Sequence, residues 1–305
     1  MIDILSKRYL YFLFSVLVIL PGLLILALNG LPLSIDFTGG SLLEVQFDGG
    51  STPPPAEVVS LYESAGIDDA QVQTTEGGSL LIRSSFLDNE TRDRILSAMQ
   101  SESNSNVSVV RFDSVGPSIG VQVASRAAMA VAIAALGVVI FITYVFRNVP
   151  NALRYGVCAV IAMAHDVAVV FSIVGIGSVF LDWQIDALFL TALLTVIGFS
   201  VQDKVVVFDR IRENTQVYRR LNYEALVNHS IVQTLQRSIN TQLMTVEFLL
   251  LALALFGGIT LQEFAIILLV GLFSGTYSSI FIAAPILVLW ENREWENWFK
   301  RKATA

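Results

Sequence analysis

The chain has 305 residues, of which 54% are apolar and only 15% are charged. Because soluble domains carry about a quarter charged residues, this composition excludes a protein that is soluble throughout. The formal net charge of −7 argues against nucleic acid as a partner. The single cysteine, Cys158, lies in an apolar run, which predicts neither a disulfide nor a thiolate metal site.

Six stretches of the sequence are apolar and long enough to cross a bilayer as helices, which takes roughly 20 residues for a hydrocarbon core about 30 Å thick. They extend approximately from Tyr9 to Leu28, Ala124 to Phe146, Leu153 to Phe180, Ile185 to Phe208, Thr241 to Phe256 and Gln262 to Trp290. The first stretch is longer than a signal-peptide core and lacks a small-residue cleavage pattern, so we interpret it as a retained anchor.

Basic residues collect on one side of these stretches, and such residues stay cytoplasmic in short loops. Lys7 and Arg8 precede the first stretch, and the segment 210–237 carries five arginines. Both chain ends are therefore predicted to be cytoplasmic. The predicted organisation is a cytoplasmic N-terminus with helix one at 1–28, an extracytoplasmic domain at 29–122, helices two to six at 123–290 with a cytoplasmic loop at about 209–240, and a cytoplasmic tail at 291–305.

The outer segment alternates between strand-like and helix-like patterns. Strands are predicted at Ser41 to Phe47, Ala70 to Thr75, Leu80 to Ser84 and Val107 to Phe112, and helices at Ala56 to Ala65 and Asn89 to Met99. The order β, α, β, β, α, β predicts an α+β, ferredoxin-like domain. Its carboxylates are scattered and it contains no His or Cys, so we expect a binding or gripping domain rather than an enzyme.

Ionisable residues inside membrane helices are costly, so each is a candidate for function. Asp203 lies in the fourth stretch, and Arg237 lies just before the fifth. Desolvation favours a protonated carboxyl and a nearby cation favours the ionised form, so Asp203 is predicted to gain a proton when buried and to lose it when Arg237 approaches. The alternative is that the membrane charges only pair with one another and hold the helices together.

Four further membrane charges are supporting candidates, namely His165, Asp166, Lys204 and Glu247. His165 and Asp166 are adjacent on a helix and so point about 100° apart. One of them is therefore expected to face the interior and the other a neighbouring helix.

Small residues recur every four positions at Gly271, Gly275 and Ser279 in the last stretch. Such a face allows two helices to approach closely. It predicts either packing within the chain or a docking face for another membrane protein.

Several strings of the sequence together resemble the SecF family of the resistance-nodulation-division superfamily. They are IDFTGG at Ile35 to Gly40, VGPSIG at Val115 to Gly120, AHD at Ala164 to Asp166, VVVFDRIREN at Val205 to Asn214, TLQRSINT at Thr234 to Thr241 and GLFSGTYSSIFIAAPIL at Gly271 to Leu287. They cover nearly the whole chain in the family's order.

The resemblance implies a subunit of the Sec translocase in a bacterial plasma membrane, surrounded by lipid. A SecD partner would supply six further helices, and the pair would use the proton gradient to draw exported unfolded polypeptides outward after the SecYEG channel and the SecA motor. No cofactor is implied beyond the ion gradient, and sodium stays open as the coupling ion.

The family's membrane carboxylate falls on Asp203 and its arginine on Arg237. The family's usual residues on either side of that carboxylate are replaced here by Gln202 and Lys204. We expect Lys204 and Glu247, two unusual opposite charges at similar depth, to compensate each other.

Two other functions are weighed against this one. The first is a self-contained small-molecule exporter of the same superfamily, which a single six-helix half disfavours unless it dimerises. The second is a non-transporting assembly factor or anchored receptor with purely structural membrane charges. An enzyme is not predicted, because the sequence contains neither GxGxxG nor GxxxxGK and no cluster typical of a catalytic or metal site.

Overall fold

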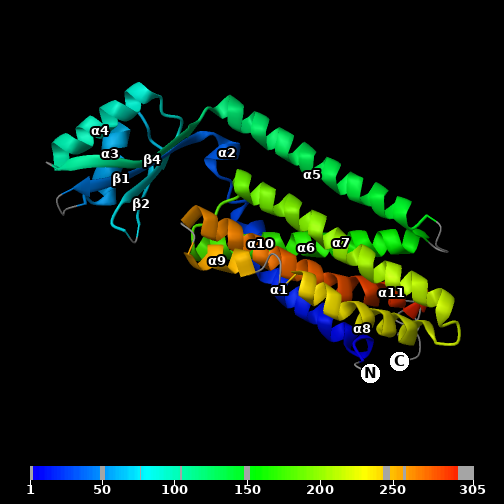
Figure 1. Cartoon of the computed structure of the whole chain (residues 1–305). Helices are drawn as coiled ribbons and strands as arrows, with labels where there is room; N and C mark the ends of the chain where they lie inside the picture. The colour runs from blue at the N-terminus through cyan, green and yellow to red at the C-terminus, as the bar shows by residue number, and fades with distance from the viewer. Residues whose placement is uncertain are drawn as a thin grey trace, which may run out of the picture. The chain divides into compact units, whose positions relative to one another are not determined.

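A computed structural model describes residues 3–48, 52–75, 77–103, 105–147, 152–242, 248–256 and 259–294 (Figure 1). The chain divides into two compact units. One comprises Met1–Pro32 with Ala130–Ala305, and the other comprises Leu33–Met129. The first unit is helical and the second contains the sheet.

The helical unit is built from long and short helices, most of them apolar. They are α1 (Arg8–Asn29, preceded by the short 3-10 turn η1, Leu5–Lys7), α6 (Ala152–Phe180), α7 (Ala187–Val217), α8 (Tyr223–Gln242), α9 (Phe248–Phe256), α10 (Ile259–Ser278), the π-helix η3 (Ser279–Ala283) and α11 (Ala284–Glu291). Helix α5 (Pro117–Val145) begins in the sheet unit and ends in the helical unit.

Within the described residues, five segments are long and apolar enough to cross a membrane. They are Leu5–Asn29, Pro117–Val145, Ala152–Phe180, Ala187–Val217 and Leu261–Glu291. These correspond to the first four predicted spans and the sixth. Part of the predicted fifth span, residues 243–247, lies outside the described residues, so that span stays a prediction.

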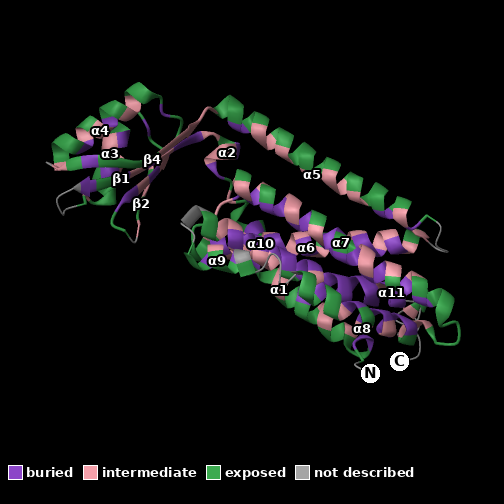
Figure 2. Ribbon diagram, viewed as in Figure 1, coloured by how far each residue is buried: buried purple, intermediate pink, exposed green. Residues whose placement is uncertain are grey.

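Burial separates central helices from peripheral ones (Figure 2). Half of the most apolar window of α6 and of α7 is buried, and 61% of the Leu261–Glu291 window is, against only 6% for α5. Ile142 of α5 is buried, but most of the large apolar side chains of this helix are exposed, so its surface is suited to lipid or to another apolar helix.

Helices α1 and α6 approach until their backbones touch. A Cβ atom added to Gly22 would lie 1.9 Å from the carbonyl oxygen of Ser172, and one added to Gly175 would lie 2.5 Å from that of Gly22. The hydroxyl of Ser172 donates to the carbonyl oxygen of Val18 at 2.8 Å. Glycine at both positions is therefore what allows this close crossing.

The segment predicted as a cytoplasmic loop at 209–240 is largely helical. Helix α7 continues to Val217, and α8 packs its apolar residues Leu226, Val227 and Ile231 against the bundle. The beginning of α1 contacts α8 and the residues after α11, because Arg8 forms ion pairs with Glu224 at 2.7 Å and with Glu294 at 2.8 Å.

The sheet unit follows the predicted order of elements. These are β1 (Gly40–Asp48), α3 (Pro55–Ser64), β2 (Gln71–Thr74), β3 (Leu80–Ser84), α4 (Asn89–Ser103) and β4 (Asn106–Val115). The strands lie in the order β2-β3-β1-β4, and every neighbouring pair is antiparallel. A bulge interrupts the pairing of β1 with β4 between Glu44 and Val45.

One face of this sheet packs against α3 and α4. Burial alternates along β3, where Leu80 and Ile82 are buried while Leu81 and Arg83 are partly exposed, as expected for side chains that point alternately to the two faces. The core consists of Leu43, Val45, Phe47, Val58, Tyr62, Ile67, Leu80, Ile82, Leu87, Ile95, Met99 and Val107.

In the sheet unit, the glycines of the string IDFTGG lie close to Gly120 of the string VGPSIG. The short helix α2 (Ile35–Thr38) ends at Gly39 with φ 76°, and Gly40 follows with φ 124°. A Cβ atom on Gly120, in the first turns of α5, would lie 2.6 Å from the backbone nitrogen of Gly39. These positions need glycine because of their backbone angles or because backbone atoms lie where a side chain would be.

Candidate functional site

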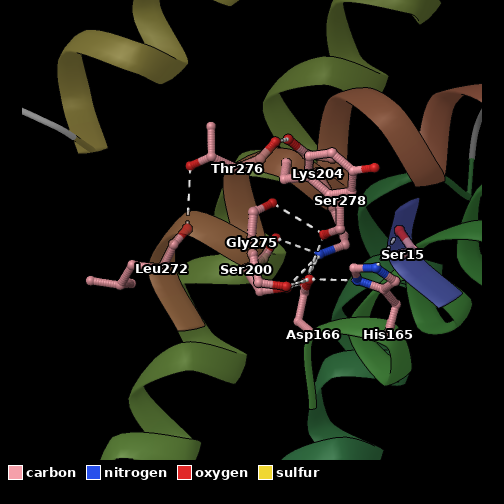
Figure 3. A network of polar contacts seen from close by, with 12 residues as sticks. Ser15, His165, Asp166, Ser200, Lys204, Leu272, Gly275, Thr276 and Ser278 are labelled. Atoms are coloured by element: carbon pink, nitrogen blue, oxygen red, sulfur yellow. Dashed lines mark hydrogen bonds and ion pairs between the residues drawn. The ribbon is translucent and has the colours of Figure 1, made fainter. Parts of the chain in front are cut away.

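A buried ion pair lies between α6 and α7 in the helical unit (Figure 3). The Nζ atom of Lys204 lies 2.7 Å from Oδ2 of Asp166. The side chain of Lys204 is fully buried, and that of Asp166 is 1% exposed. A buried ion pair needs its remaining hydrogen-bonding atoms satisfied, because otherwise desolvation outweighs the attraction.

Serine hydroxyls complete the shell around the carboxylate. Oδ2 of Asp166 accepts from the hydroxyls of Ser200 at 2.6 Å and Ser278 at 2.7 Å. Oδ1 accepts from the hydroxyl of Ser274 at 2.7 Å. All three serines are buried. Hydrogen bonds to both oxygens favour the ionised carboxylate.

The ammonium of Lys204 is equally well supplied with acceptors. Besides Asp166, it donates to the backbone oxygen of Ser200 at 3.2 Å and to the hydroxyl of the same serine. An ammonium has three donors, and three oxygen atoms surround this one. The pair is therefore a satisfied, neutral unit inside the membrane helices.

His165 contacts both the carboxylate of Asp166 and helix α1. Its Nε2 lies 2.9 Å from the hydroxyl of Ser15, and its Nδ1 lies 3.2 Å from Oδ1 of Asp166. The ring stacks on Tyr277, whose hydroxyl donates to the backbone oxygen of Tyr11 at 2.9 Å. Asp166 thus faces the interior while His165 contacts a neighbouring helix, as their spacing of about 100° leads one to expect.

The local sequence explains why these side chains meet. Ser200 and Lys204 are one turn apart on α7, and Ser274 and Ser278 are one turn apart on α10, so each pair lies on one helix face. The π-helix η3 follows directly after Ser278 and leads into Pro285. Proline removes a backbone donor, and π-helical turns occur frequently at functional sites.

Asp203 lies next to this cluster on α7 and is 7% exposed. Its Oδ1 accepts a long hydrogen bond of 3.4 Å from the hydroxyl of Ser238 on α8. Arg237 precedes Ser238 and is exposed. Arg237 forms no ion pair within the described ranges, whereas the hydroxyl of Ser238 contacts Asp203.

The structure pairs Lys204 with Asp166. Glu247 lies outside the described residues, so its compensation of Lys204 stays a prediction. Gly271 and Gly275 pack inside the chain: an added Cβ atom would lie 2.2 Å from Val196 and 3.2 Å from Ser200, respectively. The hydroxyl of Ser279 donates to the backbone oxygen of Thr276 at 2.8 Å.

Sequence reasoning missed the serines. Ser15, Ser200, Ser274 and Ser278 supply hydroxyls to the cluster, but isolated serines are common in membrane helices. The spacing of four between Ser274 and Ser278 was the available signal. Among the described residues, no group of three or more His, Cys, Asp or Glu side chains is placed to hold a metal ion.

Comparison with known proteins gives a consistent result. Residues 95–293 match the family model "Protein export membrane protein SecD/SecF, C-terminal", and residues 24–50 match "SecD/SecF GG Motif". A protein translocase subunit SecF from Anaerolinea thermophila is 68% identical over 303 residues, covering 99% of this chain and 98% of that protein.

Longer relatives match over part of their length. A protein translocase subunit SecDF from Bacillus subtilis is 34% identical, covering 96% of this chain and 38% of that protein. The crystal structure of SecDF from Thermus thermophilus, described as a translocon-associated membrane protein, superimposes with a TM-score of 0.80 at 30% identity. It covers 95% of this chain, which spans 39% of the SecDF chain.

Proposed function

The chain belongs to the SecF family of protein translocase subunits, and we propose from this premise that it works with SecD to promote late stages of protein export, driven by the proton motive force. The observation that carries the proposal is the 68% identity to a SecF protein over nearly the full length of both chains. No observation favours the small-molecule exporter of the same superfamily.

SecD is the proposed partner. The chain corresponds to less than two fifths of two proteins named SecDF, and that name supports a SecD part as what the remaining length supplies. The exposed apolar surface of α5 is suited to such a neighbour or to lipid. The SecYEG channel, the SecA motor and unfolded exported polypeptides are further proposed partners, carried over from the family.

The proposed membrane organisation has six helices, the fifth formed around α9 by residues 241–256. We place both chain ends in the cytoplasm of a bacterial cell. We place the segment 29–122, which contains the sheet, outside the plasma membrane. The order β2-β3-β1-β4 with antiparallel neighbours supports a ferredoxin-like fold for the sheet unit.

Asp203 is the proposed proton carrier. The carboxylate of Asp166 accepts hydrogen bonds from three serine hydroxyls and is paired with Lys204, which suits a permanently ionised group. Asp203 is also buried, and its Oδ1 accepts a 3.4 Å hydrogen bond from the hydroxyl of Ser238. Burial opposes ionisation of a carboxyl and a nearby cation favours it, so a buried carboxyl whose charged neighbours change is suited to bind and release a proton.

Arg237 is the proposed partner for the ionised state of Asp203. It directly precedes Ser238 on α8, and adjacent helical residues point about 100° apart. A rotation of α8 by about this angle would exchange the Ser238 hydroxyl for the Arg237 guanidinium. The cation would then stabilise ionised Asp203, which couples helix movement to proton release.

Two measurements test this function. The chain should copurify with the SecD protein of its own organism when both are expressed together. In cells that depend on the chain, Asp203→Asn should block maturation of a secreted protein, whereas the exposed outer-domain variant Asp113→Asn should support it. Normal export by Asp203→Asn at a normal membrane level would reject the proposal.

A further inference from the structure

The Lys204 ammonium lies in a set of oxygen atoms that resembles a metal-cation site. It contacts the Asp166 carboxylate at 2.7 Å, the Ser200 backbone oxygen at 3.2 Å and the Ser200 hydroxyl. The hydroxyls of Ser274 and Ser278 lie on the same carboxylate. Carboxylate, hydroxyl and backbone carbonyl oxygens are the ligands that hard, non-transition-metal cations prefer.

The cation in this site is part of the protein. The ammonium is carried by α7, one turn away from Ser200, and its side chain is fully buried. The charge of Asp166 is therefore neutralised without an ion from solution. A second cation near this ammonium would be repelled strongly, because like charges interact strongly where the effective dielectric constant is low.

We propose that Lys204 is a tethered cation that fills an alkali-cation site at Asp166, excludes Na⁺ and K⁺ from it, and thereby determines the ion specificity of this chain. Replacing Lys204 with a shorter, neutral side chain opens the site to an alkali cation. The consequence for transport is that the chain couples to protons rather than to sodium, and this part rests on the proposed function. The exclusion of Na⁺ and K⁺ from the site at Asp166 does not rest on it.

The geometry also identifies the variant that exposes the site. Lys204→Thr removes the ammonium and most of the stem and leaves a short, neutral side chain, so space and an uncompensated carboxylate become available to an incoming ion. Asp166→Asn removes the negative charge that an alkali cation requires. Lys7→Thr makes the same chemical change at an exposed residue of η1 and serves as the matched control.

The experiment measures thermal unfolding of the full chain, purified in detergent. Each protein is heated in NaCl, KCl or choline chloride at equal ionic strength, over a range of salt concentrations. Choline is too large for the site, so it controls for screening. Comparison of the Na⁺ and K⁺ series identifies which alkali ion the oxygen atoms prefer.

The wild type and Lys7→Thr should have the same Tm in all three salts. The Tm of Lys204→Thr should rise in NaCl or KCl relative to choline chloride and should saturate, with a gain of about 4 °C at a tenfold excess of ion over its Kd. In the Asp166→Asn, Lys204→Thr double variant this salt-specific rise should be absent.

Four results would overturn the proposal. The first three are a Tm of Lys204→Thr that is the same in all three salts, a rise that persists in the double variant, and an alkali-specific rise in the wild type; the fourth concerns folding. If Lys204→Thr is recovered folded only when NaCl or KCl is present, the proposal is supported, and if it unfolds in all three salts the proposal is rejected. Asp203 is unaltered in every variant, so failure here leaves the proton-carrier proposal standing.

Discussion

The ion pair between Asp166 and Lys204 should be energetically coupled, and a double-mutant cycle measures that coupling. Lys204→Met and Asp166→Asn each remove one charge while nearly preserving side-chain volume. The pair is at most 1% exposed and its atoms are 2.7 Å apart. Each single variant therefore leaves one buried, uncompensated charge among apolar helices.

The expected cost of each single change is about 3–5 kcal/mol, which lowers the ratio of folded to unfolded protein by a factor of roughly 10²–10⁴. The double variant leaves no charge, although the serine hydroxyls then share a weaker acceptor. It should cost about 1–3 kcal/mol. The coupling energy is therefore expected to be at least about 3 kcal/mol.

The assay is equilibrium unfolding of the purified full chain in mixed micelles with choline chloride as the only salt, so that no alkali cation replaces the ammonium. Lys7→Met is the control and should change the free energy of unfolding by less than about 0.5 kcal/mol. If the two single effects add up to the double effect within about 0.5 kcal/mol, the reasoning on this pair is refuted.

Three other changes have defined outcomes. Gly271→Ala places a Cβ atom 2.2 Å from Val196, so it should lower the free energy of unfolding by about 1–3 kcal/mol. Adding Val196→Ala should restore part of that loss, and no recovery in the double variant would contradict this packing. The Tyr62 hydroxyl is buried without a hydrogen-bond partner within the described residues, and burial raises its pKa. Tyr62→Phe should therefore stabilise the sheet unit by about 1 kcal/mol. Amide exchange in β1 and α3 should become slower, and faster exchange would contradict the prediction. A backbone hydrogen bond from Thr91 lowers the pKa of Asp88 below its ordinary value of 3.8. The ionised Asp88 therefore stabilises α4 above that pH, and this stabilisation is lost as the pH falls through the folded-state pKa. Asp88→Ala should speed amide exchange in the first turn of α4 at pH values well above 3.8, and an effect of equal size in strong acid would count against the ionised cap.

Much of the fold follows from simple periodicities. Runs of apolar residues located five of the membrane-capable segments, because helix length and hydrophobicity are enough to identify such elements. Alternation of apolar residues located the strands of the sheet unit. The helical packing of α8 was not predictable in the same way, since its buried face, with Leu226 and Ile231, also fits a helix lying on a membrane surface.

The candidate site was predicted in its charges but not in its connections. His165, Asp166 and Lys204 stand out in the sequence because charge is rare in membrane helices. Pairing Lys204 with Asp166 depends on how α6 and α7 are rotated, and no local pattern of one sequence specifies that rotation. The close crossing of α1 and α6 at Gly22 and Gly175 was missed for the same reason, because each helix contributes one glycine.

The most direct test of the central claim is proton flux through the chain together with SecD in liposomes that contain a pH-sensitive dye. With a proton gradient and an exported polypeptide engaged, the wild type is expected to carry protons inward. Asp203→Asn is expected to reduce this flux to the level of empty liposomes, while Asp113→Asn keeps it. Undiminished proton flux through Asp203→Asn would contradict the account.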